Sequence, residues 1–345
     1  MKIIQYGCGK MSTHTMSYSL NKGYELVGAI DINESIVGKS VNELYGVASD
    51  VKVTHSSNAR KLLEEVKPDI CIVTTMSLLS DLEEPLTLCA ELGVNAITIC
   101  EEAFYPFNSN PNLTKKIDKL AKENNCTITG TGYQDAFWGN LITTLMGASG
   151  SITKVKGSSS YNVEDYGIAL AKGHGAGLSK EDFEKEIASV DNISEEERTE
   201  LINTGKFLPS YMWNVNGWFC DKLGLKVLSQ TQKCVPTFHT EDIHSKTLGM
   251  DIKKGYCTGM RAVVTTTTDK GIVFETECVG KVYSENDFDS NVWTVEGEPT
   301  TTLTVERPNT VELTCGTVVN RLEHVVNAKP GFVPTSQLGE MTYKV

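Results

Sequence analysis

A glycine-rich turn directly after the first predicted strand is the feature that most constrains this chain. The apolar run 2–6 ends at Gly7, and a helical pattern starts at Lys10. Glycines at positions 7 and 9 allow a tight turn and a close approach to a pyrophosphate, whose charge the helix N-terminus attracts. The spacing is Gly-x-Gly-x-x-Ser, with a small serine in place of a third glycine. We therefore predict a dinucleotide-binding turn made of Gly7, Cys8, Gly9, Lys10, Met11 and Ser12.

The remainder of the first half alternates short apolar strands with amphipathic helices. Strands are predicted at 2–6, 24–30, 70–74, 96–99 and 127–130, and helices at 10–22, 59–66, 81–92 and 113–124. Strands that alternate with helices form a parallel sheet with helical crossovers. We expect an α/β fold in which residues 1–150 form a Rossmann-type dinucleotide-binding domain.

The pattern changes after Gly150. Strand-like runs are predicted at 152–160, 226–235, 261–268, 272–282 and 300–305, and residues 179–206 are charged and helical in period. Asp269-Lys270-Gly271 lies between two of these runs and is typical of a hairpin turn. We predict an α+β domain over residues 151–345 with a mostly antiparallel sheet. A further helix near 310–322 can pack back on the first domain.

Composition excludes several kinds of partner. Acidic residues outnumber basic ones 44 to 32, and the formal net charge is -12, which disfavours nucleic acid and anionic membranes. The chain contains no apolar run of about 20 residues and no basic start followed by a long apolar segment, so we expect neither a membrane span nor a secretory leader. Its ten cysteines lack a zinc-type or C-x-x-C spacing, and His239 and His244 do not fit one either. We expect reduced thiols, no metal and a cytoplasmic location.

The residues after the second and third long strands bear on the cofactor. Asp31 ends the second strand, where a carboxylate accepts hydrogen bonds from a ribose hydroxyl and repels a 2′-phosphate. This favours NAD over NADP and leaves NADP use open. Thr74, Thr75 and Met76 follow the central strand, and the switch-point rule predicts that they line the cofactor crevice. The alternative is that the two threonines satisfy the start of the next helix.

Two adjacent acids, Glu101 and Glu102, follow the strand at 96–99. Neighbouring residues of an extended chain point in opposite directions, so we expect one of the two to face the nicotinamide. Acids in such crevices are often catalytic, and the alternative is that both cap the following loop or contact solvent.

Five further residues are candidates for substrate contacts. Gln134 and Asp135 follow the strand at 127–130, where Asp135 either binds substrate or caps the helix that starts at the next residue. Tyr161, Tyr166 and His174 lie where the chain enters the second domain. Glycines flank His174, which is typical of a loop that can close over a substrate, although a lone histidine is more often structural.

The end of the strand at 96–99 departs from one known pattern and fits another. In glucose–fructose-oxidoreductase-like dehydrogenases the corresponding strand ends in a lysine that does the acid–base work, and Glu102 stands in its place here. A carboxylate suits amine chemistry, because it stabilises a developing iminium cation. The chain resembles the NAD(P)-dependent amine dehydrogenase family, which has a dihydrodipicolinate-reductase-like N-terminal domain. The resemblance extends over nearly the whole chain and rests on residues 5–12, 100–107, 130–145, 161–178, 208–217, 230–235 and 327–333.

The resemblance implies a particular reaction. It implies the NAD(P)-dependent oxidative deamination of a small diamino acid, 2,4-diaminopentanoate, to 2-amino-4-oxopentanoate and ammonia, a step in ornithine degradation during amino-acid fermentation. Glu102 would stabilise the iminium and activate water, with Glu101 as the second candidate. The resemblance further implies that residues 151–345 bind substrate and form a homodimer through their sheet. The alternatives are another amine or imine oxidoreductase, a dihydrodipicolinate-reductase-like enzyme, and a non-catalytic NAD sensor.

Overall fold

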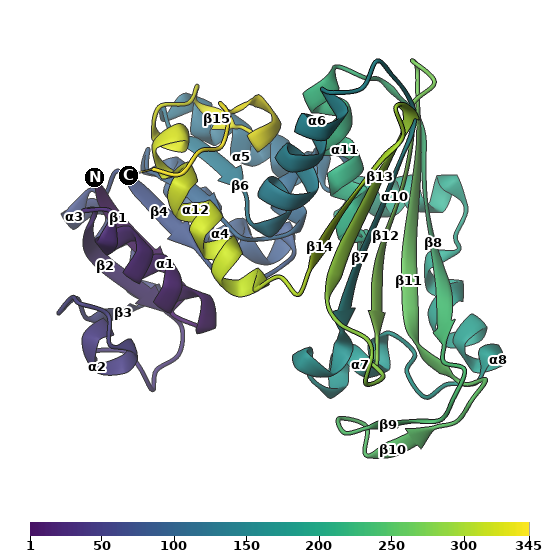
Figure 1. The fold of residues 1–345 in the computed structure, drawn as a ribbon. Coiled ribbons are helices and arrows are strands. Elements are labelled where there is room, and N and C mark those ends of the chain that lie inside the picture. The colour runs from purple at the N-terminus through teal and green to yellow at the C-terminus, as the bar shows by residue number, and fades with distance from the viewer. Residues whose placement is uncertain (345) are drawn as a thin grey trace. The chain divides into compact units, whose positions relative to one another are not determined.

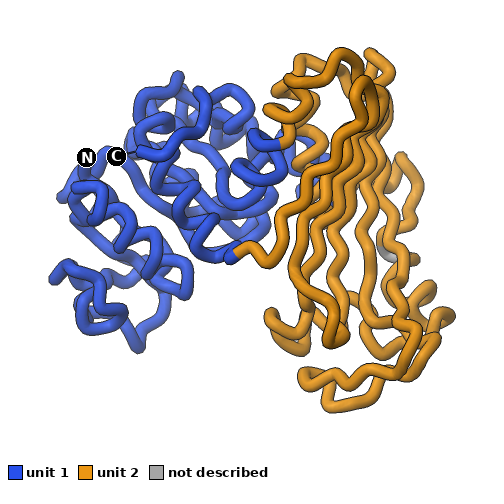
Figure 2. Tube along the Cα trace, in the orientation of Figure 1, with its two compact units in different colours: residues 1–141, 202–207, 309–345 blue, residues 142–201, 208–308 orange. Residues whose placement is uncertain are grey.

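The computed structural model describes residues 1–344, which form two compact units (Figures 1 and 2). The first comprises Met1–Leu141, Ile202–Phe207 and the segment from Asn309 onward, and the second comprises Ile142–Leu201 and Leu208–Pro308. The sequence places a boundary near residue 150, whereas the units divide after Leu141. The last helix and the segment that follows it lie in the first unit.

The first unit is built on a seven-stranded parallel sheet, which confirms the predicted fold class. The strand order is β15-β6-β5-β4-β1-β2-β3, and adjacent strands in this order are hydrogen-bonded to each other. The strands are β1 (Lys2–Tyr6), β2 (Glu25–Asp31), β3 (Val53–His55), β4 (Ile70–Val73), β5 (Asn95–Thr98), β6 (Thr127–Gly130) and β15 (Gly331–Phe332). Sequence analysis missed β3 and β15, because runs of two or three residues carry no periodic signal.

Helices cover both faces of this sheet. Along β1, Ile3 belongs to a core cluster shared with α1 and α12, and Ile4 belongs to a cluster shared with α3, α4 and α5. Because the sheet is buried on both faces, its strands are uniformly apolar. The helix α12 lies beside α1 (Figure 1). The helices are α1 (Lys10–Asn21), α2 (Val41–Tyr45), α3 (Ala59–Val66), α4 (Glu83–Glu91), α5 (Pro111–Glu123) and α12 (Thr310–Val326), with short helical turns η1 (Ser56–Asn58), η2 (Leu79–Leu82), η3 (Glu102–Phe104), η4 (Pro106–Asn108), η5 (Gln134–Asn140) and η8 (Thr335–Gln337).

The second unit is built on a six-stranded mixed sheet in the order β14-β13-β7-β12-β11-β8. The neighbours β7 and β12 pair parallel and the other neighbours pair antiparallel, as predicted for a mostly antiparallel sheet. Its strands are β7 (Ser151–Asn162), β8 (Val227–Phe238), β11 (Cys257–Thr268), β12 (Val273–Lys281), β13 (Ser290–Glu298) and β14 (Thr301–Glu306), and a small hairpin adds β9 (Ile243–Ser245) and β10 (Met250–Ile252). The remaining helical segments are α6 (Leu141–Met146), η6 (Val163–Tyr166), α7 (Ile168–Gly173), α8 (Lys180–Phe183), η7 (Glu184–Ala188), α9 (Ser189–Asp191), α10 (Glu195–Thr204) and α11 (Tyr211–Leu223).

The helix α11 is fixed against one face of this mixed sheet. Phe219 stacks on Phe274 of β12 with ring centroids 5.2 Å apart. The buried Asn216 amide donates to the Thr266 hydroxyl (3.1 Å) and accepts from the Thr276 hydroxyl (2.9 Å), so it bridges β11 and β12. These contacts hold the middle of α11 against the sheet. Among residues 1–344, no helix is both long and apolar enough to cross a membrane.

Candidate active site

The glycine-rich turn lies between β1 and α1, at the carboxyl edge of the parallel sheet. Gly7 has φ +89°, and a Cβ at this position would lie 2.7 Å from the Thr74 carbonyl oxygen. Both its conformation and its close packing against β4 therefore require glycine. A Cβ on Gly9 would meet nothing within 4 Å, and no side chain caps the N-terminus of α1. The turn thus leaves space and an uncapped helix N-terminus where a pyrophosphate can bind.

A buried network of polar side chains holds the glycine turn in place. The Gln5 amide donates to the Gly7 carbonyl (2.9 Å) and to the Thr74 hydroxyl (2.8 Å), and it accepts from the Thr15 hydroxyl (2.7 Å). The Thr74 hydroxyl donates to the same Gly7 carbonyl (2.8 Å). Sequence analysis missed Gln5, although a polar residue inside an otherwise apolar strand is a signal. Thr74 therefore supports the turn through its hydroxyl, and its predicted place in the cofactor crevice stays a prediction.

Asp31 lies at the end of β2 and contacts the same turn. One of its carboxylate oxygens accepts from the Cys8 backbone N–H (2.6 Å), and the other accepts from the Asn33 N–H (2.7 Å). Burial and, to a smaller extent, the negative charge of Asp31 raise the pKa of the Cys8 thiol to about 12, so Cys8 stays protonated. Asp31 thus places one negative charge beside the turn. Each oxygen keeps a lone pair for a further donor.

Apolar side chains flank the turn at the carboxyl ends of β2 and β4. Ile32, directly after β2, is 74% exposed, and Met76, shortly after β4, is 53% exposed. Thr75 is exposed beside Met76. Exposed apolar side chains at this edge can cover the flat rings of a dinucleotide, and contacts of Thr75 and Met76 with the cofactor stay a prediction.

Glu102 is a buried residue whose carboxylate oxygens each accept one hydrogen bond within the first unit. It is 3% exposed, and its oxygens accept from the Leu79 backbone N–H (2.7 Å) and the Ser109 hydroxyl (2.7 Å). Burial raises its pKa, and the two hydrogen bonds oppose that rise. In this geometry Glu102 ties η2 to the turn after η4. Because Glu102 is buried, little of its side chain is open to a substrate.

Glu101 follows the carboxyl end of β5 and is partly exposed as a residue. Burial raises its pKa, and a hydrogen bond with the Ser77 side chain opposes the rise. Ser77 itself follows β4, the strand next to β5. A carboxylate in this position can hold a developing positive charge or take a proton. The sequence favoured Glu102, whereas the geometry favours Glu101.

Asp135 is buried in an ion pair that the sequence did not reveal. Its carboxylate accepts from Arg321 of α12 at Nε (2.8 Å) and at a terminal nitrogen (3.2 Å), and both side chains are fully buried. The Thr131 hydroxyl and the Asn140 amide also donate to it. With both oxygens used, Asp135 anchors α12 and is not available for substrate, which corrects its predicted role. Gln134 is also buried, and its amide donates to the Thr131 carbonyl (3.4 Å).

In the second unit, the structure brings together Tyr161, Tyr166 and His174. The Tyr161 hydroxyl lies 2.7 Å from His174 Nε2, and the rings of Tyr161 and Tyr166 meet edge to face at 5.9 Å. Tyr166 is 61% exposed, whereas His174 is buried and its pKa is lowered by that burial. The three residues therefore form one cluster that a ligand can reach from the Tyr166 side.

The remaining candidate groups show no reactive arrangement among residues 1–344. No group of three His, Cys, Asp or Glu side chains in that range is placed to hold a metal ion. His239 pairs with Asp287 (3.2 Å) and His244 with Asp251 (2.8 Å), so the two histidines do not converge. The ten cysteines are buried free thiols.

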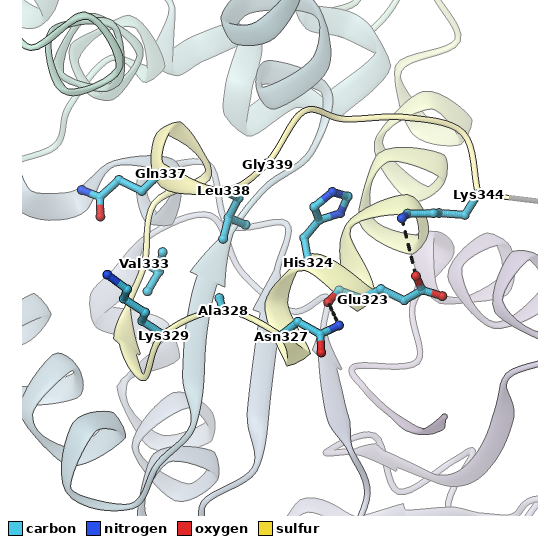
Figure 3. A pocket seen from close by; sticks show the side chains of 10 residues that line it. All are labelled: Glu323, His324, Asn327, Ala328, Lys329, Val333, Gln337, Leu338, Gly339 and Lys344. Atoms are coloured by element: carbon cyan, nitrogen blue, oxygen red, sulfur yellow. Dashed lines mark hydrogen bonds and ion pairs between the residues drawn. The ribbon is translucent and has the colours of Figure 1, made fainter.

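A pocket of about 630 Å³ lies elsewhere in the first unit, between the end of α12 and the C-terminal segment (Figure 3). Lys344 pairs there with Glu323 (3.5 Å). The nearby Lys329 carbonyl accepts from Thr127, the first residue of β6. The pocket is lined by the end of α12 and the segment that follows it, and no residue of the glycine turn lines it.

The doubly wound sheet, its switch point between β1 and β4, and the glycine turn define the chain as an NAD(P)-dependent dehydrogenase. Over its whole length it is similar to an amine dehydrogenase from Mycobacterium smegmatis of known structure. The two are 35% identical, the match covers 100% of this chain and 97% of that one, and the TM-score is 0.82. The chain belongs to the amine dehydrogenase family.

A curated relative is more distant. The 2,4-diaminopentanoate dehydrogenase of Acetoanaerobium sticklandii is 25% identical over 189 residues, which are 54% of this chain and 54% of that protein. The match thus spans about half the length of the relative. No protein-family model matches the chain.

Other solved structures share the fold. A probable dehydrogenase from Thermotoga maritima is 11% identical with a TM-score of 0.57, and the match covers 97% of this chain and 92% of that one. A biliverdin reductase from Synechocystis is 12% identical with a TM-score of 0.53, over 93% and 90% of the two chains. At these identities the likeness concerns the architecture alone.

Proposed function

We propose that this amine dehydrogenase oxidatively deaminates 2,4-diaminopentanoate to 2-amino-4-oxopentanoate and ammonia, with NAD as the hydride acceptor. The observation that carries the proposal is the partly exposed Glu101 after the carboxyl end of β5, one strand away from the switch point between β4 and β1. The curated relative supports the choice of substrate. This reaction would be a step in ornithine degradation.

The residues of the turn fit a dinucleotide. The space above Gly9 and the uncapped start of α1, with Lys10, Met11 and Ser12, would receive the pyrophosphate. Asp31 would accept from a ribose hydroxyl through its remaining lone pairs. Ile32 and Met76 would pack against the rings. When bound, NAD accepts the hydride from the carbon that carries the amine.

Glu101 would act on the substrate nitrogen and on water. The amine must first lose its extra proton, and departure of the hydride then leaves a cationic iminium. An ionised Glu101 would stabilise that cation, and it would next take a proton from the water that attacks the carbon. The resulting carbinolamine receives this proton on nitrogen. As ammonia leaves, Glu101 takes the proton of the carbinolamine hydroxyl, which leaves the ketone. Glu102 is the second candidate for the same role.

The second unit would supply the remaining substrate contacts and a dimer surface. One face of its sheet is covered by α11, and the opposite face carries the partly exposed Val263 and Val279 and the 38% exposed Val292. Apolar side chains on such an open face can pack against the same face of a second copy in a two-fold symmetric dimer. We include a homodimer through this face in the proposal.

A panel of substrates tests the proposed reaction. NADH formation at alkaline pH would be followed with 2,4-diaminopentanoate, ornithine, lysine, alanine and a simple aliphatic amine, each with NAD and with NADP. We expect turnover of the 2,4-diamino acid far above the others. If the enzyme turns over simple amines alone, the substrate is a simple amine and the assignment of the diamino acid is wrong. Cofactor binding without any turnover would favour the NAD sensor.

Asp31 is expected to set the cofactor preference. Two charges about 4 Å apart repel by about 1 kcal/mol in water and by about 4 kcal/mol near a protein surface, so Asp31→Ser should raise the NADP-to-NAD ratio of kcat/KM on the order of 10- to 100-fold. The control is Asp50→Ser, which removes the same charge from an exposed loop. Steady-state kinetics with both cofactors measure the ratio. An unchanged ratio in Asp31→Ser would contradict the role of Asp31.

A further inference from the structure

The glycine turn contains two peptide groups that the structure holds in different ways. In the first, between Gly7 and Cys8, both polar groups have partners. The Gly7 carbonyl accepts from the side chains of Gln5 and Thr74, and the Cys8 N–H donates to Asp31 (2.6 Å). The direction of this first peptide group is therefore fixed from both sides.

The second peptide group, between Cys8 and Gly9, is held from one side. Its carbonyl oxygen, on Cys8, accepts from the hydroxyl of Tyr45 at the end of α2. Its N–H, on Gly9, makes no hydrogen bond within residues 1–344. Gly9 is exposed, and a Cβ there would meet nothing within 4 Å. An N–H without a protein partner on an exposed residue is left to solvent or to a ligand.

The Tyr45 hydroxyl sets the direction of the Gly9 N–H. In a planar trans peptide the C=O and N–H bonds point in opposite directions, so the Gly9 N–H points away from Tyr45. Gly9 has φ -85°, and a half-turn of this peptide group would bring φ to a positive value, which glycine tolerates. The backbone of Gly9 thus does not prevent the peptide group from turning over. The turned-over group would present a carbonyl oxygen where the N–H now lies, and that oxygen would repel an anion.

The helix α2 holds Tyr45 in place beside the turn. Val41, its first residue, is fully buried, and the Val41 N–H donates to the Val51 carbonyl (2.9 Å). The Tyr45 ring packs against the same apolar cluster that contains Val41. A phenol has one proton, and Tyr45 donates it to the Cys8 carbonyl, which can only accept. Removal of the hydroxyl alone therefore breaks this hydrogen bond and keeps the packing of the ring.

We propose that Tyr45 is a positioning residue for the cofactor, whose hydroxyl orients the Cys8–Gly9 peptide group so that the Gly9 N–H donates to the pyrophosphate. This inference rests on the part of the proposed function that places the pyrophosphate at the glycine turn, and it does not depend on the amine substrate. Asp31 acts on the ribose, where NAD and NADP differ. Tyr45 acts on the pyrophosphate, which both cofactors share.

The variant Tyr45→Phe tests the proposal through binding. Fluorescence titration measures the Kd of NADH and of NADPH, and displacement of NADH measures the Kd of ADP-ribose and of adenosine, which lacks phosphate. The loss of one neutral hydrogen bond corresponds to a factor of about 2 to 10 in an equilibrium constant. We expect NADH, NADPH and ADP-ribose to bind more weakly by one common factor in this range, and adenosine to bind as it does to the wild type.

Three results would overturn the role of Tyr45. An equal loss for adenosine would mean that the hydroxyl supports the adenosine side of the site as a whole. No loss for any ligand would mean that the peptide group keeps its direction without Tyr45. A changed ratio of NADPH to NADH affinity would assign Tyr45 to the ribose. If the wild type itself binds ADP-ribose no better than adenosine, the pyrophosphate does not lie at the turn, and that part of the proposed function fails first.

Tyr24→Phe is the matched control. Tyr24 packs against the same apolar cluster as Tyr45, and its hydroxyl donates to Glu323 of α12 (3.1 Å) and not to the turn. We expect this variant to bind all four ligands as the wild type does. Thermal denaturation of both variants checks that the packing of the rings is retained. A loss in Tyr24→Phe equal to that in Tyr45→Phe would contradict a specific action on the Cys8–Gly9 peptide group.

Discussion

Replacing Glu101 by glutamine is expected to lower kcat by about 10²- to 10⁴-fold, which is the usual contribution of a general acid–base group. The substitution keeps the size of the side chain and removes the charge that would stabilise an iminium. NADH binding, followed by fluorescence, should stay near the wild-type affinity, because Asp31 and the glycine turn are untouched. Steady-state kinetics with 2,4-diaminopentanoate and a fluorescence titration measure the two quantities.

The pH profile adds a second readout for Glu101. Burial raises the pKa of its carboxyl group above the ordinary value. A base works in its ionised form, so kcat should fall as the pH drops through this raised pKa and Glu101 becomes protonated. Above that pKa Glu101 is ionised, and a further rise in pH no longer changes kcat through this group. In Glu101→Gln this acid limb should disappear from the residual activity.

Glu102→Gln is the matched control for the same chemistry. An amide can accept from only one of the two donors at Leu79 and Ser109, so we expect a loss of stability of about 1–3 kcal/mol. Turnover of the folded enzyme should stay within about tenfold of the wild type. Should Glu102→Gln abolish turnover while Glu101→Gln keeps it, the catalytic role belongs to Glu102 and the geometric assignment is wrong.

Arg321→Met is expected to cause the largest loss of stability in the first unit, about 3–5 kcal/mol. The change leaves the Asp135 carboxylate buried without its counter-charge, and it also removes the bond from Arg321 to the Gly339 carbonyl (2.6 Å). The double variant Asp135→Asn with Arg321→Met should recover part of the loss, because no unpaired charge remains. Urea denaturation measures the free energy of unfolding of each variant.

A surface ion pair serves as the control for Arg321. Lys116 and Glu83 lie 2.6 Å apart, and about half of each side chain is exposed. Lys116→Met should therefore change the stability by no more than about 1 kcal/mol. Similar small effects of Lys116→Met and Arg321→Met would show that the buried pair does not anchor α12.

The sequence predicted the longer strands and helices of the first unit to within a few residues, because their apolar residues follow a clear pattern. The parallel sheet is buried on both faces, so each central strand is a short apolar run, and each crossover helix has its own apolar stripe. The strands β3, β9, β10, β13 and β15 and the short helix α2 were missed. All of these except β13 are too short to show a period, and β13 is largely polar.

The choice between Glu101 and Glu102 could not be made from the sequence. The argument from alternation assumes an extended chain, but β5 ends at Thr98 and Glu101 has helical backbone angles, φ -62° and ψ -41°. The period of two no longer applies there. Which carboxylate is buried is decided by Leu79 and Ser109, which reach Glu102 from other segments.

Local chemistry along the chain determined the glycine turn, the charge at Asp31 and the order of strands and helices, because each depends on residues within one β-α-β segment. Tertiary structure alone decided the roles of Asp135, Thr74 and Glu102. Asp135 meets Arg321 across 186 positions, and Thr74 meets Gln5 across 69. A buried polar group must find a partner, and only the fold shows which distant residue provides it.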